Sequence, residues 1–187
     1  EVVLPASLAG RHVSLHFGGI SYRANVWFNG TQIDTKDKVV GVFRQYEYDV
    51  TALARPGEPN VVAVEVIGPG PHDLAFMWVD WNPTPADKNM GLWGEVLLVD
   101  SGPIALKNPH VVTQLELPSL DKARLTVTVE ARNTTDRPVS GVVRGAIETV
   151  QFAKCVSLGA GERSVVRFTP ADVPQLAVEK PRLWWPY

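Results

Sequence analysis

Residues 78–82 carry the side chains with the most evident chemistry in the sequence. Trp78 and Trp81 supply two indole rings, while Asp80 and Asn82 supply a carboxylate and an amide, all within five residues. Aromatic rings stack against apolar C–H faces, whereas carboxylate and amide groups exchange hydrogen bonds with hydroxyl groups. A sugar ring presents both kinds of surface. The segment therefore favours contact with a carbohydrate, and Asp80, Trp81 and Asn82 are the candidate binding residues.

A purely structural role for the same side chains stays open. Trp78 and Trp81 could pack the segment onto a neighbouring β-sandwich, because an indole ring buries a large area. Asp80 could cap a turn, and Asn82 followed by Pro83 is itself a turn signal. Residue types alone do not separate these two interpretations.

The other reactive side chains do not assemble a site. Cys155 is the single cysteine, lies in an apolar stretch, and is expected to be a buried strand thiol rather than a nucleophile. His12 and His16 are four residues apart and lack a third ligand, which argues against zinc. Asp34 and Asp37 could hold a calcium ion, although a charged hairpin is the commoner explanation. We therefore expect neither a metal nor a cofactor.

The composition excludes two classes of partner. The chain has 187 residues, with 18 Lys and Arg against 20 Asp and Glu, and its formal net charge at pH 7 is −2. Nucleic-acid-binding domains normally carry a basic face and a high pI, so no nucleic acid partner is expected. The longest apolar runs fall far short of the roughly 18 residues that a membrane span needs, so no membrane partner is expected either.

Short alternating runs separated by turns predict an all-β chain. Valine is abundant and suits pleated sheets, while 15 Gly and 15 Pro punctuate turns. No segment shows a sustained period of 3.6 residues, the signature of a helix. The expected strands are residues 12–17, 22–28, 32–33, 41–50, 60–67, 93–99, 110–117, 123–132, 139–147 and 163–168.

Residues 68–91 interrupt this pattern and contain the candidate binding residues. A loop of this length inside a compact domain is uncommon and usually functional. A second series of strands begins after the turn at residues 100–103. We therefore expect two β-sandwiches that meet near Pro103.

Blocks in both halves resemble glycoside hydrolase family 2. Residues 22–30 and 41–51, followed by 78–83 leading into 89–96, resemble the N-terminal sugar-binding-like jelly roll of that family. They look most like the exo-β-D-glucosaminidase branch, with the β-mannosidases next. The second half, which ends in residues 181–187, is similar to the immunoglobulin-like domain that follows the jelly roll in the same family.

The resemblance implies an organisation and a division of labour. It implies a jelly-roll (galactose-binding-like) sandwich over residues 1–103, with its N-terminal part missing, and an immunoglobulin-like β-sandwich over residues 104–187, with its C-terminal part missing. The parent protein would be a retaining glycosidase whose two catalytic glutamates lie in a later TIM barrel. No catalytic residue is expected in this chain, and Glu47 and Glu95 are expected on solvated strand faces.

The resemblance also gives the loop a role. In related β-mannosidases, a Trp-Asp pair from this loop reaches the subsite of the terminal sugar. Carried over by motif, the match is Asp80 with Trp81 beside it, although Val79 stands where those enzymes have a tryptophan. The implied role of Asp80, assisted by Asn82, is to hydrogen-bond hydroxyl groups of the terminal sugar.

Three functional hypotheses follow. The first is the non-catalytic N-terminal portion of an exo-β-D-glucosaminidase that acts on chitosan-type oligosaccharides, with the carbohydrate held mainly by the barrel. The second is the same portion of a β-mannosidase, and the third is an independent carbohydrate-binding module. For the parent enzyme, a secreted or periplasmic location is expected.

Overall fold

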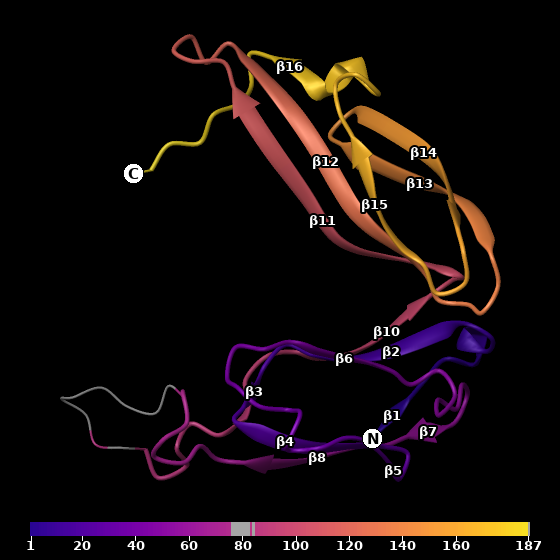
Figure 1. The fold of residues 1–187 in the computed structure, drawn as a ribbon, viewed down its shortest axis with the longest axis vertical. Coiled ribbons are helices and arrows are strands. Elements are labelled where there is room, and N and C mark those ends of the chain that lie inside the picture. The colour runs from indigo at the N-terminus through magenta and orange to yellow at the C-terminus, as the bar shows by residue number, and fades with distance from the viewer. Residues whose placement is uncertain (76–82, 84, 187) are drawn as a thin grey trace. The chain divides into compact units, whose positions relative to one another are not determined.

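The computed structural model describes residues 1–75, 83 and 85–186, and the chain divides into two compact units (Figure 1). Unit 1 is Glu1–Ser101 and unit 2 is Gly102–Tyr187. Antiparallel strands make up both units, and the only helical turns among the described residues are η1 (Ala6–Leu8) and η2 (Pro174–Leu176). None of the described helices has the length and apolar character to span a membrane. The all-β prediction is confirmed.

Two three-stranded antiparallel sheets form the body of unit 1. One has the strand order β10-β2-β6 and the other β5-β4-β8, and the pairs β1-β7 and β3-β9 are two-stranded. The strands are β1 (Val2–Val3), β2 (His12–Phe17), β3 (Ile20–Ser21), β4 (Arg23–Phe28), β5 (Thr31–Asp34), β6 (Tyr46–Asp49), β7 (Pro59–Asn60), β8 (Val62–Ile67), β9 (Gly91–Leu92) and β10 (Val96–Ser101).

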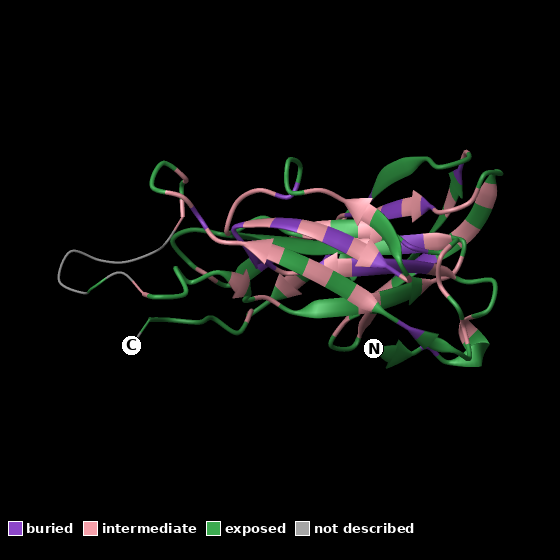
Figure 2. Ribbon diagram, turned by 90° about the horizontal axis from the view of Figure 1, so that it is seen from below, coloured by how far each residue is buried: buried purple, intermediate pink, exposed green. Residues whose placement is uncertain are grey.

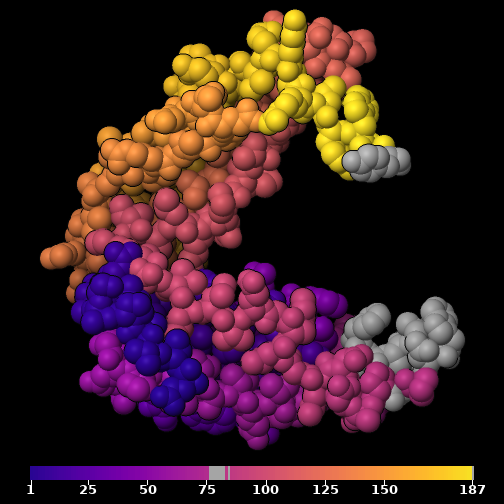
Figure 3. All heavy atoms as spheres, turned by 180° about the vertical axis from the view of Figure 1, so that it is seen from behind, coloured from indigo at the N-terminus to yellow at the C-terminus, as the bar shows by residue number. Residues whose placement is uncertain are grey.

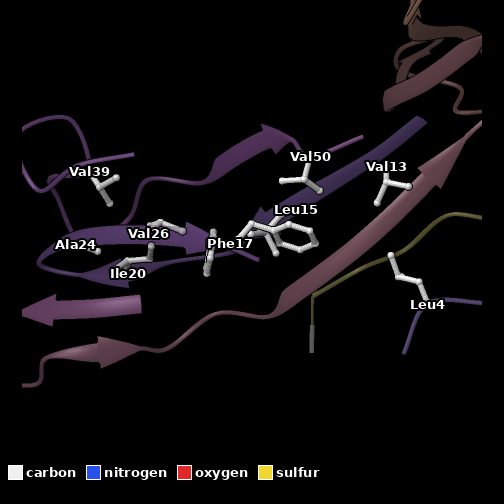
Figure 4. Packing of buried hydrophobic residues seen from close by; sticks show 10 residues of the cluster. Leu4, Val13, Leu15, Phe17, Ile20, Ala24, Val26, Val39 and Val50 are labelled. Atoms are coloured by element: carbon white, nitrogen blue, oxygen red, sulfur yellow. The ribbon is translucent and has the colours of Figure 1, made fainter. Parts of the chain in front are cut away.

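The core of unit 1 comes from the middle strand of each of its three-stranded sheets. Alternate side chains of β2 and of β4 are buried in one cluster, because successive residues of a strand point to opposite faces (Figure 4). The buried members are Val13, Leu15 and Phe17 from β2 and Ala24, Val26 and Phe28 from β4. The alternation predicted for residues 12–17 and 22–28 is therefore the one that builds the core.

The strand predicted over residues 41–50 is mostly wrong. Only Tyr46–Asp49 pairs as β6, and residues 41–45 form no strand. Gly41, the first residue of the predicted strand, has a φ of 113°, a conformation that favours glycine, and residues 42 and 43 form a bend before β6. Phe43, predicted to alternate in the strand, is consequently exposed.

Unit 2 is a sandwich of a four-stranded and a two-stranded sheet. In the larger sheet β12 lies between β11 on one side and β15 and β16 on the other, whereas the smaller sheet is the hairpin β13-β14. In the space-filling view, the atoms of each unit form one closely packed body (Figure 3). The strands are β11 (Ile104–Leu115), β12 (Lys122–Asn133), β13 (Val139–Ile147), β14 (Val150–Leu158), β15 (Arg163–Phe168) and β16 (Ala177–Glu179).

The core of unit 2 follows the same rule of alternation, visible as bands of buried and exposed residues along the strands (Figure 2). Phe152 of β14 and Phe168 of β15 are both buried, with ring centroids 4.7 Å apart. Cys155 lies in β14 as predicted, but the prediction that it is buried is wrong. Phe152 and Leu158 take the inward positions of β14, so the odd-numbered Cys155 points outward.

Candidate functional site

The predicted binding residues Asp80, Trp81 and Asn82, with the neighbouring Trp78, lie outside the described residues. What the structure describes is the base of their loop, on both sides of that segment. We call this base the neck; it consists of residues 68–75 before the binding residues and 85–95 after them. The roles of the three residues stay predictions.

The first side of the neck is fixed to β4 by an ion pair. Arg23, the first residue of β4, donates a hydrogen bond from Nη2 to Oδ1 of Asp73 at 2.9 Å. The other carboxylate oxygen of Asp73 accepts the Gly70 N–H at 2.9 Å. The Gly70 N–H, together with the Arg23 guanidinium, holds the pKa of Asp73 below its usual value. Asp73 is therefore charged at neutral pH and closes a tight turn against the sheet.

The second side of the neck is fixed by strand pairing and by Trp93. β9 pairs with β3, with Ile20 opposite Leu92. The indole Nε1 of Trp93 donates to the carbonyl oxygen of Val42 at 2.8 Å. Its ring lies so close to Gly19 that an added Cβ would come within 2.3 Å of it. The absence of a side chain on Gly19 therefore leaves the space that the Trp93 ring occupies.

The chain directly after Trp93 packs backbone against backbone. A Cβ on Gly94 would lie 2.4 Å from the carbonyl carbon of Gly18, a distance that real Cβ atoms do not reach. The Gly18 N–H donates to the Glu95 carbonyl at 2.8 Å and closes the contact. Position 94 thus requires glycine because two backbone segments touch there, while a Cβ on Gly18 would make a tighter than usual contact of 3.0 Å with the Glu95 nitrogen.

A turn over residues 87–89, within the second side of the neck, precedes the contact between the two sides. Lys88 and Asn89 have positive φ values, and Asp87 accepts the Asn89 N–H at 3.0 Å, as in an Asx turn. These residues are exposed. Met90 is 48% exposed, but its Sδ lies 3.2 Å from the position of a Cβ on Gly68. Gly68 and Met90, at the two ends of the loop, are therefore neighbours.

Among the described contacts, those of the β2 histidines differ from the contacts of a catalytic relay. Nε2 of His16 lies 2.8 Å from the Ser14 hydroxyl and 3.8 Å from a carboxylate oxygen of Glu47. Both contacts use the same ring nitrogen, whereas a relay needs the base and the orienting carboxylate on opposite nitrogens. His12 instead faces Asp49, with Nε2 3.2 Å from Oδ2. Glu47 is exposed, as predicted.

The carboxylate of Asp34, in the acidic hairpin, accepts structural hydrogen bonds. Asp34 accepts the Tyr48 hydroxyl at 2.8 Å on one carboxylate oxygen and the Thr35 N–H at 2.8 Å on the other. Burial, reinforced by this carboxylate, raises the pKa of Tyr48 well above its usual value. Within the described ranges no three His, Cys, Asp or Glu side chains gather as a metal site would require. Glu95 is exposed as predicted, but it lies just before β10 (Val96–Ser101) rather than on a strand face.

The residues that build the neck were not predicted from the sequence. Arg23 and Asp73 are 50 positions apart, and no local pattern links them. Gly18 and Gly19 do carry a signal, since glycine in or beside a strand marks close backbone approach as well as a strand break. The partner that makes Gly19 necessary is Trp93, which is distant in sequence.

Comparisons with known proteins agree with the fold and with the family resemblance. A family model described as glycosyl hydrolase 2 galactose-binding domain-like matches residues 1–69, and one described as glycosyl hydrolases family 2 matches residues 104–187. The exo-β-D-glucosaminidase of Streptomyces avermitilis is 42% identical over 173 residues, which are 92% of this chain and 19% of the relative. A mannosylglycoprotein endo-β-mannosidase of Lilium longiflorum is 31% identical over 205 residues, with 94% of this chain and 21% of the relative covered.

A solved structure gives the same result in three dimensions. The exo-chitosanase CsxA of Amycolatopsis orientalis matches with a TM-score of 0.86 and 35% identity, over 100% of this chain and 21% of that chain. The chain thus spans about a fifth of the length of the relatives it matches. Both family models describe the same family, and together they cover most of both units. The chain therefore belongs to glycosyl hydrolase family 2 and contains its galactose-binding-like jelly roll followed by its immunoglobulin-like sandwich.

Proposed function

We propose that the chain is the non-catalytic N-terminal portion of an exo-β-D-glucosaminidase that acts on chitosan-type oligosaccharides. The observation that carries the proposal is the 42% identity to the exo-β-D-glucosaminidase of Streptomyces avermitilis, sustained over 92% of this chain. The exo-chitosanase structure supports it, because the match covers both units. The acid and nucleophile of a retaining glycosidase must flank one bond, about 5–5.5 Å apart, and we assign them to the rest of the parent protein.

Within this function, the loop at residues 68–91 contributes to the substrate site. Asp80 accepts hydrogen bonds from hydroxyl groups of the terminal sugar, Asn82 assists, and Trp81 stacks against the ring. The neck supports this role, because the Arg23–Asp73 pair and the Trp93–Gly19 contact give the loop a fixed base. A fixed base lowers the entropy that the loop loses when substrate binds.

The open face of unit 2 supports a larger parent protein. Inward positions of β11 are occupied by Leu106, Val111 and Leu115, yet all three are exposed. Among the described strands, β13 pairs with β14 alone, so its other edge offers unpaired backbone groups. A further segment of the parent protein would cover this face and pair with this edge.

Substitution of Asp80 in the full-length parent tests the role of the loop. Loss of a hydrogen bond to a charged group costs about 1.5–3 kcal/mol. Asp80→Ala should therefore lower kcat/KM for glucosamine oligosaccharides by about tenfold to a hundredfold. Asp87→Ala is the matched control, since it removes a carboxylate from an exposed turn of the same loop. An Asp80→Ala enzyme with unchanged kcat/KM would overturn the assignment.

Two alternatives are separated by substrate and by direct binding. The lily relative favours a β-mannosidase as the second candidate, since it matches 94% of the chain, although at the lower identity of 31%. Comparing hydrolysis of aryl β-D-glucosaminide and aryl β-D-mannoside by the parent enzyme distinguishes the two activities. Calorimetric titration of the 187-residue chain with glucosamine oligomers tests the third hypothesis, because an independent binding module should bind them without the barrel, whereas an accessory portion should show little affinity.

A further inference from the structure

Two aromatic side chains lie exposed together beside the neck. Phe43 is 76% exposed and Trp93 is 56% exposed, although both belong to residue types that are normally buried. Their ring centroids are 5.7 Å apart and the planes meet at 72°, an edge-to-face pair. The two residues come from segments that are 50 positions apart in the chain. We call this pair the aromatic platform.

The Trp93 ring of the platform is fixed by a hydrogen bond, and both rings are exposed. The Trp93 indole is fixed at its Nε1 by the Val42 carbonyl and rests on Gly19. Gly41, with its φ of 113°, sets the course of the backbone that delivers Phe43. The Trp93 ring therefore loses little further conformational freedom if a ligand stacks on it, which favours binding.

The size of the platform suits a sugar better than a protein. A buried aromatic side chain contributes about 150–250 Å², so two partly exposed rings offer about 300 Å². A stable protein–protein interface needs roughly 800 Å² on each partner. An area of this size matches one or two pyranose rings, whose C–H faces stack on aromatic planes. Exposed Arg44, Gln45 and Glu95 are close in sequence and could hydrogen-bond the hydroxyl rim.

We propose that Phe43 and Trp93 form a stacking subsite for a sugar unit of the oligosaccharide other than the terminal one. The proposal rests on the proposed function, which gives the terminal unit to the barrel and to Asp80. Trp93 follows directly on the loop that carries Asp80, so the platform belongs to the same part of unit 1. The ligand class is a β-linked oligosaccharide of glucosamine, long enough to extend beyond the terminal unit.

Kinetics of the full-length parent with long and short substrates test the platform. The probes are a glucosamine hexamer and an aryl β-D-glucosaminide, which has no second sugar unit. Stacking pairs contribute about 0.5–1.5 kcal/mol, which corresponds to about a two- to tenfold change. Phe43→Ala should therefore lower the ratio of hexamer to aryl kcat/KM by about fivefold, through KM, while Phe43→Trp restores it. Val3→Ala, which truncates another exposed apolar side chain of unit 1, should keep the wild-type ratio.

A direct readout keeps the two proposals separable. If the wild-type parent hydrolyses neither substrate, the glucosaminidase assignment fails, and the platform is then judged by the NMR signal of the Trp93 indole N–H during titration with the hexamer. A shift that is lost in Phe43→Ala supports the subsite. An unchanged kinetic ratio in Phe43→Ala, or the absence of any indole shift, overturns it. An equal loss on both substrates with a lowered Tm also overturns it, because that pattern reports a structural role.

Discussion

Gly94→Ala should destabilise unit 1 by about 3 kcal/mol. The added Cβ would lie 2.4 Å from the Gly18 carbonyl carbon and 2.6 Å from the Gly19 nitrogen. These are backbone atoms, so no side-chain rotation can relieve the clash. Overpacking of a tight contact costs about 1–3 kcal/mol, and the upper value applies where backbone must separate. Separation would also strain the adjacent β3-β9 ladder, which has only two residue pairs.

The assay is equilibrium unfolding by heat and urea, followed by circular dichroism. For a unit of about 100 residues, 1 kcal/mol shifts the Tm by about 4–8 °C, so 3 kcal/mol lowers it by about 12–24 °C. Gly102→Ala is the matched control, because a Cβ there meets nothing within 4 Å. If the Gly94→Ala protein melts at the same temperature as the Gly102→Ala protein, the backbone contact at Gly18 does not constrain the sequence and the reasoning is refuted.

Four further outcomes are expected. Phe28→Ala should cost about 3–5 kcal/mol in urea unfolding, because the ring is fully buried; a loss below about 1 kcal/mol would contradict the core described for unit 1. Burial raises the pKa of Asp49, but two hydrogen bonds from Thr51, with His12 nearby, outweigh it and leave the pKa below its usual value. The stability that Asp49 contributes is therefore present above about pH 4 and lost as the pH falls through its folded pKa, so Thr51→Val should flatten the dependence of unfolding free energy on pH between about 2 and 5. Cys155 should react with a thiol reagent in the native protein at the rate of an exposed thiol, and protection until unfolding would contradict its outward position. The 187-residue chain alone should self-associate through the uncovered face of β11 and the free edge of β13, and a clean monomer by size-exclusion chromatography with a sharp melt would show that this face needs no cover.

The parts of the fold that local alternation controls could be predicted from the sequence. Residues 12–17 alternate apolar and polar side chains, and β2 has the same bounds. The same rule could have placed Cys155 outward, since Phe152 and Leu158 set the inward positions of its strand, but an apolar neighbourhood was given more weight than position. The strand predicted over residues 41–50 starts only at Tyr46, because Gly41 has a positive φ and residues 42 and 43 form a bend, and residue types do not encode these backbone angles uniquely.

The candidate site likewise has one part that could be predicted from the sequence and one part that could not. The residue types of the loop indicated carbohydrate chemistry, because a carboxylate, an amide and indole rings in five positions are a local feature. The neck could not be found from the sequence, because Arg23 and Asp73, or Gly19 and Trp93, meet only through pairing of distant strands. Long-range contacts of this kind follow from the whole fold rather than from any window of sequence.

The neck also explains how a loop of this length is compatible with a compact sandwich. The entropy lost on closing a loop grows only slowly with its length, so most of the cost lies in holding the two ends together. Here the ends are held by contacts that belong to the sandwich: Met90 beside Gly68, the Arg23–Asp73 pair, and β9 on β3.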